Sequence, residues 1–117
     1  MTVPEAVTPA PPQLVVVTLP DEIDMTNAGR VYQQIAAEFA RGAPVVIADM
    51  TGTTFCDTLG TRAIVQACHR AARDRSELRL LPSPEVMRMW KILGLEAVLP
   101  IYTSLHEAMA GAGSPAR

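Results

Sequence analysis

Hydrophobic residues along the chain follow two alternating patterns: short segments rich in valine, isoleucine and leucine, and longer segments with helical spacing. The short segments predict strands at 14–19, 44–50 and 77–81, as is typical of buried parallel strands. Between the first two segments, apolar residues recur at the helical interval, at Ala28, Val31, Ile35 and Phe39. We expect a helix there, capped by Thr26 and ended by Gly42 in a left-handed conformation, with Pro44 beyond it as a breaker.

The alternation continues towards the C-terminus. A second helix is expected after the turn-prone residues 51–54 and the segment 55–57. Its expected core side consists of Leu59, Ala63, Ile64, Ala67, Cys68 and Ala71. A third helix begins at Ser83, has proline at its first position and ends at Gly94. Its expected core side consists of Val86, Trp90 and Leu93. A short strand at 98–102 and a last helix, opened by a capping box at 104–107, complete the predicted elements.

Strands that alternate with helices at these spacings predict an α/β fold with right-handed crossovers. We expect a single domain with a mostly parallel central sheet of four to five strands and about four helices. The domain is expected to span 13–111, and 117 residues are a typical length for one domain. The Pro/Ala-rich residues 1–12 are interpreted as a tail or a weak edge strand, and 112–117 as a C-terminal tail.

Charge and composition narrow the classes of function. A net charge of −2 argues against a nucleic-acid surface. Acidic residues interrupt the one arginine cluster, which favours a solvated helix face, with a docking patch for an acidic partner as the other interpretation. The cluster consists of Arg70, Arg73, Arg75 and Arg79. No apolar run approaches the ~20 residues that span a bilayer, and the N-terminal residues lack the basic start of a secretory signal. We expect a cytoplasmic protein without membrane insertion.

The two cysteines, Cys56 and Cys68, are too few for a metal set or a disulfide framework. We interpret them as small, reduced, buried side chains. A redox pair stays open as the alternative, because both lie near the segment with the clearest functional signal.

Three carboxylates each follow an apolar segment: Asp24, Asp49 and Asp57. Strand ends of an α/β sheet meet at one edge, so some of them are candidates for neighbours there. The alternative is turn and capping chemistry, which suits aspartate at such junctions. His69 and His106 fall within predicted helices, and no nucleophile set, phosphate loop or metal-ligand spacing emerges. The sequence therefore predicts no enzyme, no cofactor and no metal site.

Asp57-Thr58-Leu59-Gly60 is the most informative tetrapeptide. Thr58 lies where a helix begins, so its hydroxyl is a candidate N-cap. A hydroxyl at an exposed helix start is also a good phosphoacceptor, because the helix dipole tolerates the added negative charge. Gly60 has no side chain, which allows another backbone to approach the first turn closely.

In the order of its segments the chain resembles the STAS family, and within it the bacterial anti-sigma factor antagonists. The resemblance covers about 14–110. It is carried by LPDEID (19–24), VVIADMTGTTFCDTLGTRAI (45–64) and LRLLPSPEVMRMWKILGLEAVLPIYTSLHEAM (78–109). It implies a partner that is both an anti-sigma factor and a serine-threonine kinase, whose binding releases a sigma factor. It also implies a phosphoacceptor at Thr58 that inactivates the protein when modified. The partner-binding residues that it implies are Asp24, Asp57, Leu59, Gly60 and Thr61.

The sequence departs from the family's pattern at several positions. Thr58 replaces the commoner serine, and Leu59 puts a large apolar group where a small or polar one is usual. Pro20 replaces a turn glycine, and residues 1–12 hold no convincing first strand. Because of these departures, a second interpretation keeps the fold without the switch, as an accessory or sensor module of a transporter or stress-signalling complex.

Two further interpretations concern a receiver domain and a contact patch on the third predicted helix. A receiver domain that accepts phosphate on aspartate needs a lysine after its last strand, but Lys91, the only lysine, lies within a predicted helix. The sequence therefore argues against a receiver domain.

The third predicted helix also carries apolar residues off its core side, at Met87, Met89 and Ile92. One interpretation is that neighbouring elements cover them, and the other is that they form an adaptable contact patch.

Overall fold

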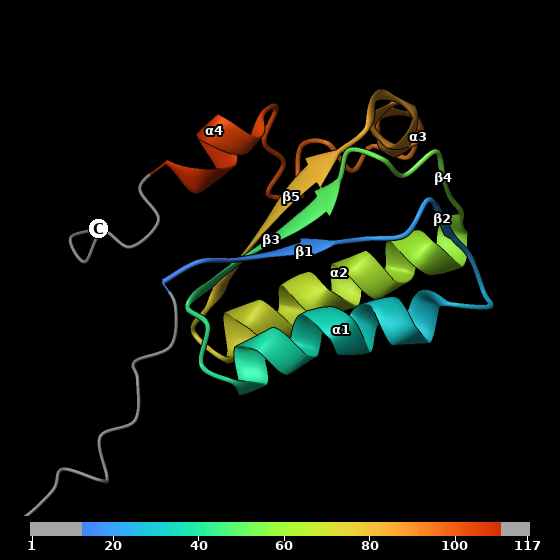
Figure 1. Cartoon of the computed structure of the whole chain (residues 1–117). Coiled ribbons are helices and arrows are strands. Elements are labelled where there is room, and N and C mark those ends of the chain that lie inside the picture. The colour runs from blue at the N-terminus through green and yellow to red at the C-terminus, as the bar shows by residue number, and fades with distance from the viewer. Residues whose placement is uncertain (1–12, 111–117) are drawn as a thin grey trace, which may run out of the picture.

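The computed structural model describes residues 13–110, which form five strands and four helices (Figure 1). In chain order these are β1 (Val15–Thr18), β2 (Glu22–Ile23), α1 (Ala28–Ala40), β3 (Val45–Met50), β4 (Phe55–Cys56), α2 (Thr58–Arg73), β5 (Glu77–Pro82), α3 (Pro84–Ile92) and α4 (Leu105–Met109). The predicted tails at 1–12 and 112–117 lie outside the described residues, as does residue 111.

The strands form two parallel sheets, in the orders β1-β3-β5 and β2-β4. The central strand β3 is almost wholly buried, as its mostly apolar sequence predicts. The predicted α/β fold is confirmed. Its strands are divided between a main sheet of three and a small sheet made of a pair of two-residue strands. That small pair is held to the main sheet by side chains in the connecting loops: the buried Thr53 hydroxyl donates to the carbonyl of Pro20 at 2.8 Å.

The helices cover the two faces of the main sheet unequally (Figure 1). Helices α1 and α2 lie together on one face, over a core that includes Ile35, Val46, Ile64 and Leu80. The short helix α4 lies over the other face, where a smaller apolar cluster contains Ile47, Leu81 and Ala108. The larger core continues to Trp90 of α3, beyond the carboxyl ends of the strands.

Helix α1 begins differently from the prediction. Its N-cap position is Asn27, and the hydroxyl of Thr26 donates to the Asp24 carboxylate at 2.6 Å instead of capping the helix. The expected end is confirmed, because Gly42 has a φ of 96°, in the left-handed region that glycine adopts without strain.

The prediction that Leu59 and Leu93 belong to the core is wrong. Leu59 of α2 is 42% exposed and Leu93, after α3, is 49% exposed. Leu59 lies in the first turn of α2, and Leu93 is the C-cap residue of α3. The other expected core residues of α2 are buried, except Cys68, which is half-buried and packs against the core.

The strand expected at 98–102 is reduced to a single parallel bridge between Leu80 and Ile101. A helical turn occupies the preceding residues, because the amides of Val98 and Leu99 both donate to the carbonyl of Leu95. Pro100 has no amide hydrogen to offer to a ladder, although its carbonyl accepts from Leu80 at 2.9 Å.

Arg79 does not belong to the exposed arginine cluster. It lies in β5 and is 8% exposed, donating to the carbonyls of Ala108 at 2.7 Å and Ala110 at 3.0 Å. It also pairs with Glu77 and lies 5.5 Å from the ring centroid of Tyr102. Arg79 therefore fastens the end of α4 to the sheet.

Among the described residues, no helix is long and apolar enough to cross a membrane.

Candidate functional site

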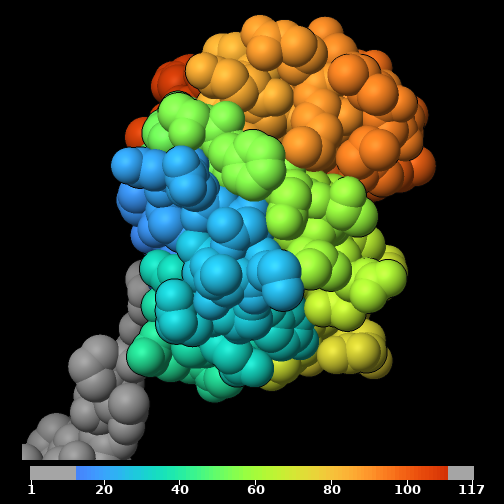
Figure 2. Space-filling model, turned by 90° about the vertical axis from the view of Figure 1, so that its right-hand side faces the viewer, coloured from blue at the N-terminus to red at the C-terminus, as the bar shows by residue number. Residues whose placement is uncertain are grey.

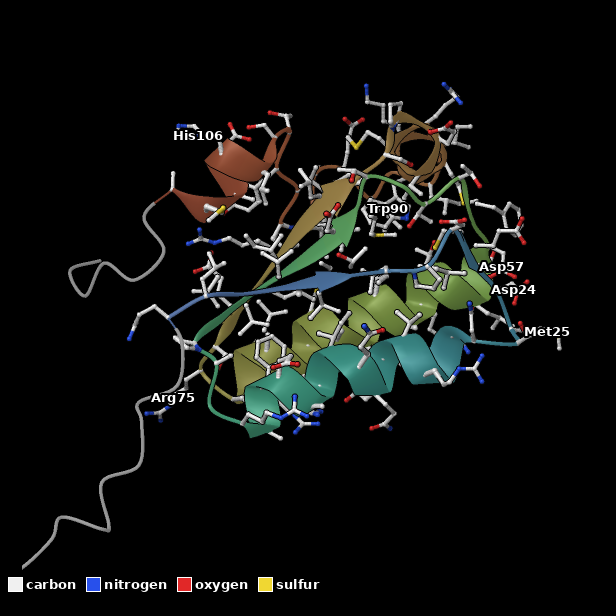
Figure 3. All side chains as sticks on the ribbon, viewed as in Figure 1. Asp24, Met25, Asp57, Arg75, Trp90 and His106 are labelled. Atoms are coloured by element: carbon white, nitrogen blue, oxygen red, sulfur yellow. The ribbon has the colours of Figure 1, made fainter. Side chains whose placement is uncertain are left out.

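Two of the three strand-end carboxylates are brought together, at the same end of the molecule (Figure 3). Ile23 of β2 pairs with Cys56 of β4, so Asp24 and Asp57 follow neighbouring strand ends. The amide of Asp57 donates to the carbonyl of Ile23 at 3.0 Å, which extends this pairing by one residue. Asp49 lies apart in the main sheet, paired with Thr18 and Leu81.

Asp49 takes the turn role that we considered for all three carboxylates. It accepts hydrogen bonds from the amide and the hydroxyl of Thr51, at 2.9 and 2.7 Å. These contacts stabilise the turn after β3, as aspartate commonly does at such positions.

Asp57, and not Thr58, caps helix α2. Its carboxylate accepts from the amide of Gly60 at 2.8 Å, and its extended backbone has the φ of −80° and ψ of −172° of an N-cap. The prediction that Thr58 supplies the cap is therefore wrong. Thr58 is the first helical residue and is exposed, at the positive end of the helix dipole.

Gly60 is required by the packing beneath this turn. A Cβ atom there would lie 2.7 Å from Cγ2 of Ile23 and 2.9 Å from Sγ of Cys56, closer than real Cβ contacts allow. The carbonyl oxygen of Ile23 would be equally close, at 2.9 Å. The expected close approach of a backbone to Gly60 is thus found within the chain itself, where β2 lies under the start of α2.

Thr61 connects the start of α2 to the interior. It is 5% exposed, and its hydroxyl oxygen accepts from Nε1 of Trp90 at 3.2 Å and lies 3.6 Å from Sγ of Cys56. Gly60 and Thr61 are both buried, so neither offers the exposed surface that the predicted direct contact with a partner requires. Sequence reasoning placed Trp90 in the core but missed this hydrogen bond, which joins segments far apart in the chain.

The Asp24 carboxylate is held in a fixed position. It accepts from the amide and the hydroxyl of Thr26, at 2.9 and 2.6 Å, and these hydrogen bonds keep the pKa of its carboxyl below its ordinary value. Asn27 holds the loop from the other side, accepting from the Asp24 amide and donating to the carbonyl of Glu22. Sequence reasoning missed Asn27, although an Asp-x-Thr-Asn run before a helix is typical of such side-chain turns.

Large apolar side chains are exposed around the two carboxylates. Met25 is 74% exposed and Phe55 is 47% exposed, in addition to Leu59. In Figure 2 the segment at 20–28 and the segment around 55–62 adjoin on one face of the molecule. We name this face the end surface, made of Asp24, Met25, Phe55, Asp57, Thr58 and Leu59. Exposed apolar groups rimmed by charges are typical of a protein-binding site.

Both cysteines are free thiols, and Cys56 is buried whereas Cys68 is half-buried. Burial raises the pKa of Cys56, which is 1% exposed, and raises the pKa of Cys68 to about 11. Across residues 13–110, no three histidine, cysteine or acidic side chains come together to hold a metal ion.

Comparison with known proteins agrees with this fold. The family model described as "STAS domain" matches residues 5–108. An anti-sigma factor antagonist from Mycobacterium paratuberculosis is 24% identical, with a TM-score of 0.73 over 84% of this chain and 85% of that one. The Bacillus cell fate determinant SpoIIAA in its phosphorylated form is 20% identical, with a TM-score of 0.58 over 79% and 85%. The anti-sigma factor antagonist SpoIIAA in its unphosphorylated form is 18% identical, with a TM-score of 0.66 over 84% of this chain and 88% of that one. None of the proteins with curated descriptions matches the chain. At these identities, the solved structures establish the fold.

Proposed function

Because the chain belongs to the STAS family, we propose that it is an anti-sigma factor antagonist controlled by phosphorylation. It binds an anti-sigma factor that is also a serine-threonine kinase, and this binding releases a sigma factor for transcription. Phosphorylation of Thr58 ends the binding. The protein acts in the cytoplasm by binding and not by catalysis, and needs no cofactor.

The observation that carries the proposal is the division of roles between Asp57 and Thr58. Asp57 supplies the helix cap, so the exposed Thr58 hydroxyl is not needed to cap the helix. A phosphate there adds a charge of about −1.5 to −2 at a helix N-terminus, where the helix dipole favours an anion. The modification therefore changes the surface without removing a contact that holds the fold.

The solved relatives support the same interpretation. SpoIIAA is described in both an unphosphorylated and a phosphorylated form, so this fold accommodates phosphate in at least that protein. We propose that the end surface of the present chain contacts the kinase, with Asp24 and Asp57 near its nucleotide site and Leu59 in apolar contact. Gly60 and Thr61 support this surface from beneath.

The test is phosphorylation by the anti-sigma factor kinase recovered with the protein in a pull-down from its own cells. After incubation with ATP, mass spectrometry should find one phosphate, on Thr58, and none on the Thr58→Ala variant. Thr54→Ala is the matched control, because Thr54 is also exposed and lies in the preceding loop. Phosphate found mainly on Thr51, Thr53 or Thr54 would overturn the assignment.

The exposure of Leu59 and Met25 favours a second candidate, the accessory or sensor module. An apolar contact of this kind can hold a constant partner without any modification. A stable partner recovered in the same pull-down, together with an unmodified Thr58 in the presence of every co-purifying kinase, would select this candidate instead.

A further inference from the structure

A groove runs along the seam between α1 and α2, beginning beside the end surface. It consists of two hollows of about 330 Å³ each that share Tyr32 and Gln66 in their walls. The first reaches Met25 and Leu59, and the second is bounded by His69 and Arg73 on α2. At the helical rise of 1.5 Å per residue, the groove follows α2 for about 21 Å.

The wall that α2 contributes is positively charged, although the chain as a whole is negative. No aspartate or glutamate occurs within α2, which carries Arg62, His69, Arg70 and Arg73. Among residues 13–110, Arg70 pairs with Asp74 at 2.8 Å, whereas Arg62 and Arg73 take part in no ion pair. Two uncompensated arginines therefore line the groove or its rim.

We propose that this groove binds an acidic amphipathic helix of the protein partner. A third helix fits the seam between two packed helices, where apolar side chains enter the groove between the ridges. The ligand helix would place apolar residues against Met25 and Leu59, and carboxylates against Arg62 and Arg73. This inference rests on the proposed function, since the groove begins at Leu59, the residue after the phosphoacceptor.

The arrangement of charge also orients the ligand. The end surface carries Asp24 and Asp57, whereas the far part of the groove carries Arg73. An acidic helix therefore lies with its most negative turns away from Thr58. A phosphate on Thr58 would add negative charge at the end of the groove lined by Met25, Leu59 and Arg62, where it would offset the charge of Arg62 and oppose an acidic ligand.

The test uses designed peptides, so that no partner needs to be identified. The probe is a fluorescein-labelled amphipathic peptide of about five helical turns, with leucines at helical spacing and glutamates on its flanks. One comparison peptide has lysine at every glutamate position, and another has the same composition in an order without an apolar face. We expect the acidic amphipathic peptide to bind at least about tenfold more tightly than either, and binding to weaken as salt is added.

Charge reversal locates the binding. Arg62→Glu with Arg73→Glu should weaken binding of the acidic peptide by about tenfold or more. Arg88→Glu with Lys91→Glu is the matched control, since it reverses the same number of exposed positive charges on α3 and should change little. Circular dichroism of each variant checks that it is folded.

Three results would overturn the inference: equal binding of the lysine peptide, equal binding of the peptide without an apolar face, or equal loss in the α3 control. A change in the sedimentation of the free protein on reversal of Arg62 and Arg73 would assign the groove to a second copy of the chain. Peptide binding needs neither a kinase nor Thr58, so it is measured on Thr58→Ala as well. Failure of phosphorylation and failure of the groove are therefore separate outcomes.

Discussion

The first turn of α2 has two sides that differ in almost every physical respect. On the inner side, Gly60 leaves no room for a methyl group and Thr61 is hydrogen-bonded to Trp90. On the outer side, Thr58 and Leu59 are exposed. One helical turn thus combines a tightly packed inner side with an exposed outer side. A charge added to the outer side can therefore change binding without disturbing the packing beneath it.

The largest expected effect is on the outer side and concerns binding. Protein phosphorylated on Thr58 should lose about a hundredfold or more in affinity for its partner, because like charges at an interface cost several kcal/mol. Its melting temperature should stay close to that of the unmodified protein, since the helix N-terminus accepts the anion. Calorimetry and circular dichroism on the same samples measure both quantities.

Thr58→Glu should also lower the affinity for the partner, but by less than the phosphate does, because glutamate carries a single charge. If phosphorylated protein binds its partner as tightly as the unmodified form, the switch is wrong and the accessory-module candidate replaces it.

On the inner side, Gly60→Ala should lower the free energy of unfolding by about 1–3 kcal/mol, the usual cost of overpacking. The added methyl group meets Ile23 and Cys56, and Ile23 presents backbone as well as side chain there. Gly29→Ala in α1 is the matched control: its Cβ meets no atom within 4 Å, so alanine should stabilise the helix by up to about 1 kcal/mol. Urea unfolding compares the two variants, and effects of the same sign and size would contradict this account of the packing.

Asp57 and Thr58 can be separated by their stability effects. Asp57→Ala removes the carboxylate that accepts from the Gly60 amide and should cost about 1 kcal/mol in the free energy of unfolding. Thr58→Ala should stay within about 0.5 kcal/mol, as exposed substitutions usually do. A larger loss for Thr58→Ala than for Asp57→Ala in urea unfolding would return the cap to Thr58.

The smallest effect is expected for the cysteines: Cys56 lies beneath Gly60, and Cys68 packs against the core further along α2. The thiolate is the reactive form, and burial raises the pKa of Cys68 to about 11, so native alkylation at pH about 8 should be slow. Cys56 should react slowly for the same reason and because it is almost inaccessible. Mass spectrometry after labelling of native and unfolded protein measures this. Rapid native labelling of both thiols, or a disulfide that changes partner affinity, would revive the redox alternative.

Local patterns in the sequence were sufficient for the order of the main strands and helices. They were also sufficient for two of the four predicted N-terminal helix caps: Ser83 accepts from the Val86 amide at 3.1 Å, and Ser104 accepts from the Glu107 amide at 3.0 Å. The other half of the predicted capping box differs, because the Glu107 carboxylate accepts from the amide of Thr103 and not from that of Ser104. Caps are predictable because the partners lie within one helical turn of each other.

The candidate site could be placed near Thr58 from the sequence, but not built from it. The pairing of β2 with β4 could not be predicted, because two-residue strands are too short to show an alternating pattern. That pairing is what brings Asp24 beside Asp57 and places Ile23 under Gly60.

The apolar side of each helix, the approximate position of each helix and the caps of α3 and α4 followed from the sequence, since these depend on neighbours within a few residues. The exposure of Leu59, the hydrogen bond from Trp90 to Thr61 and the contact of Arg79 with the end of α4 became visible in the folded structure alone. Each of these depends on where a segment distant in the chain comes to lie. Helical spacing gives the direction in which a side chain points, whereas burial depends on whether another element is present there to cover it.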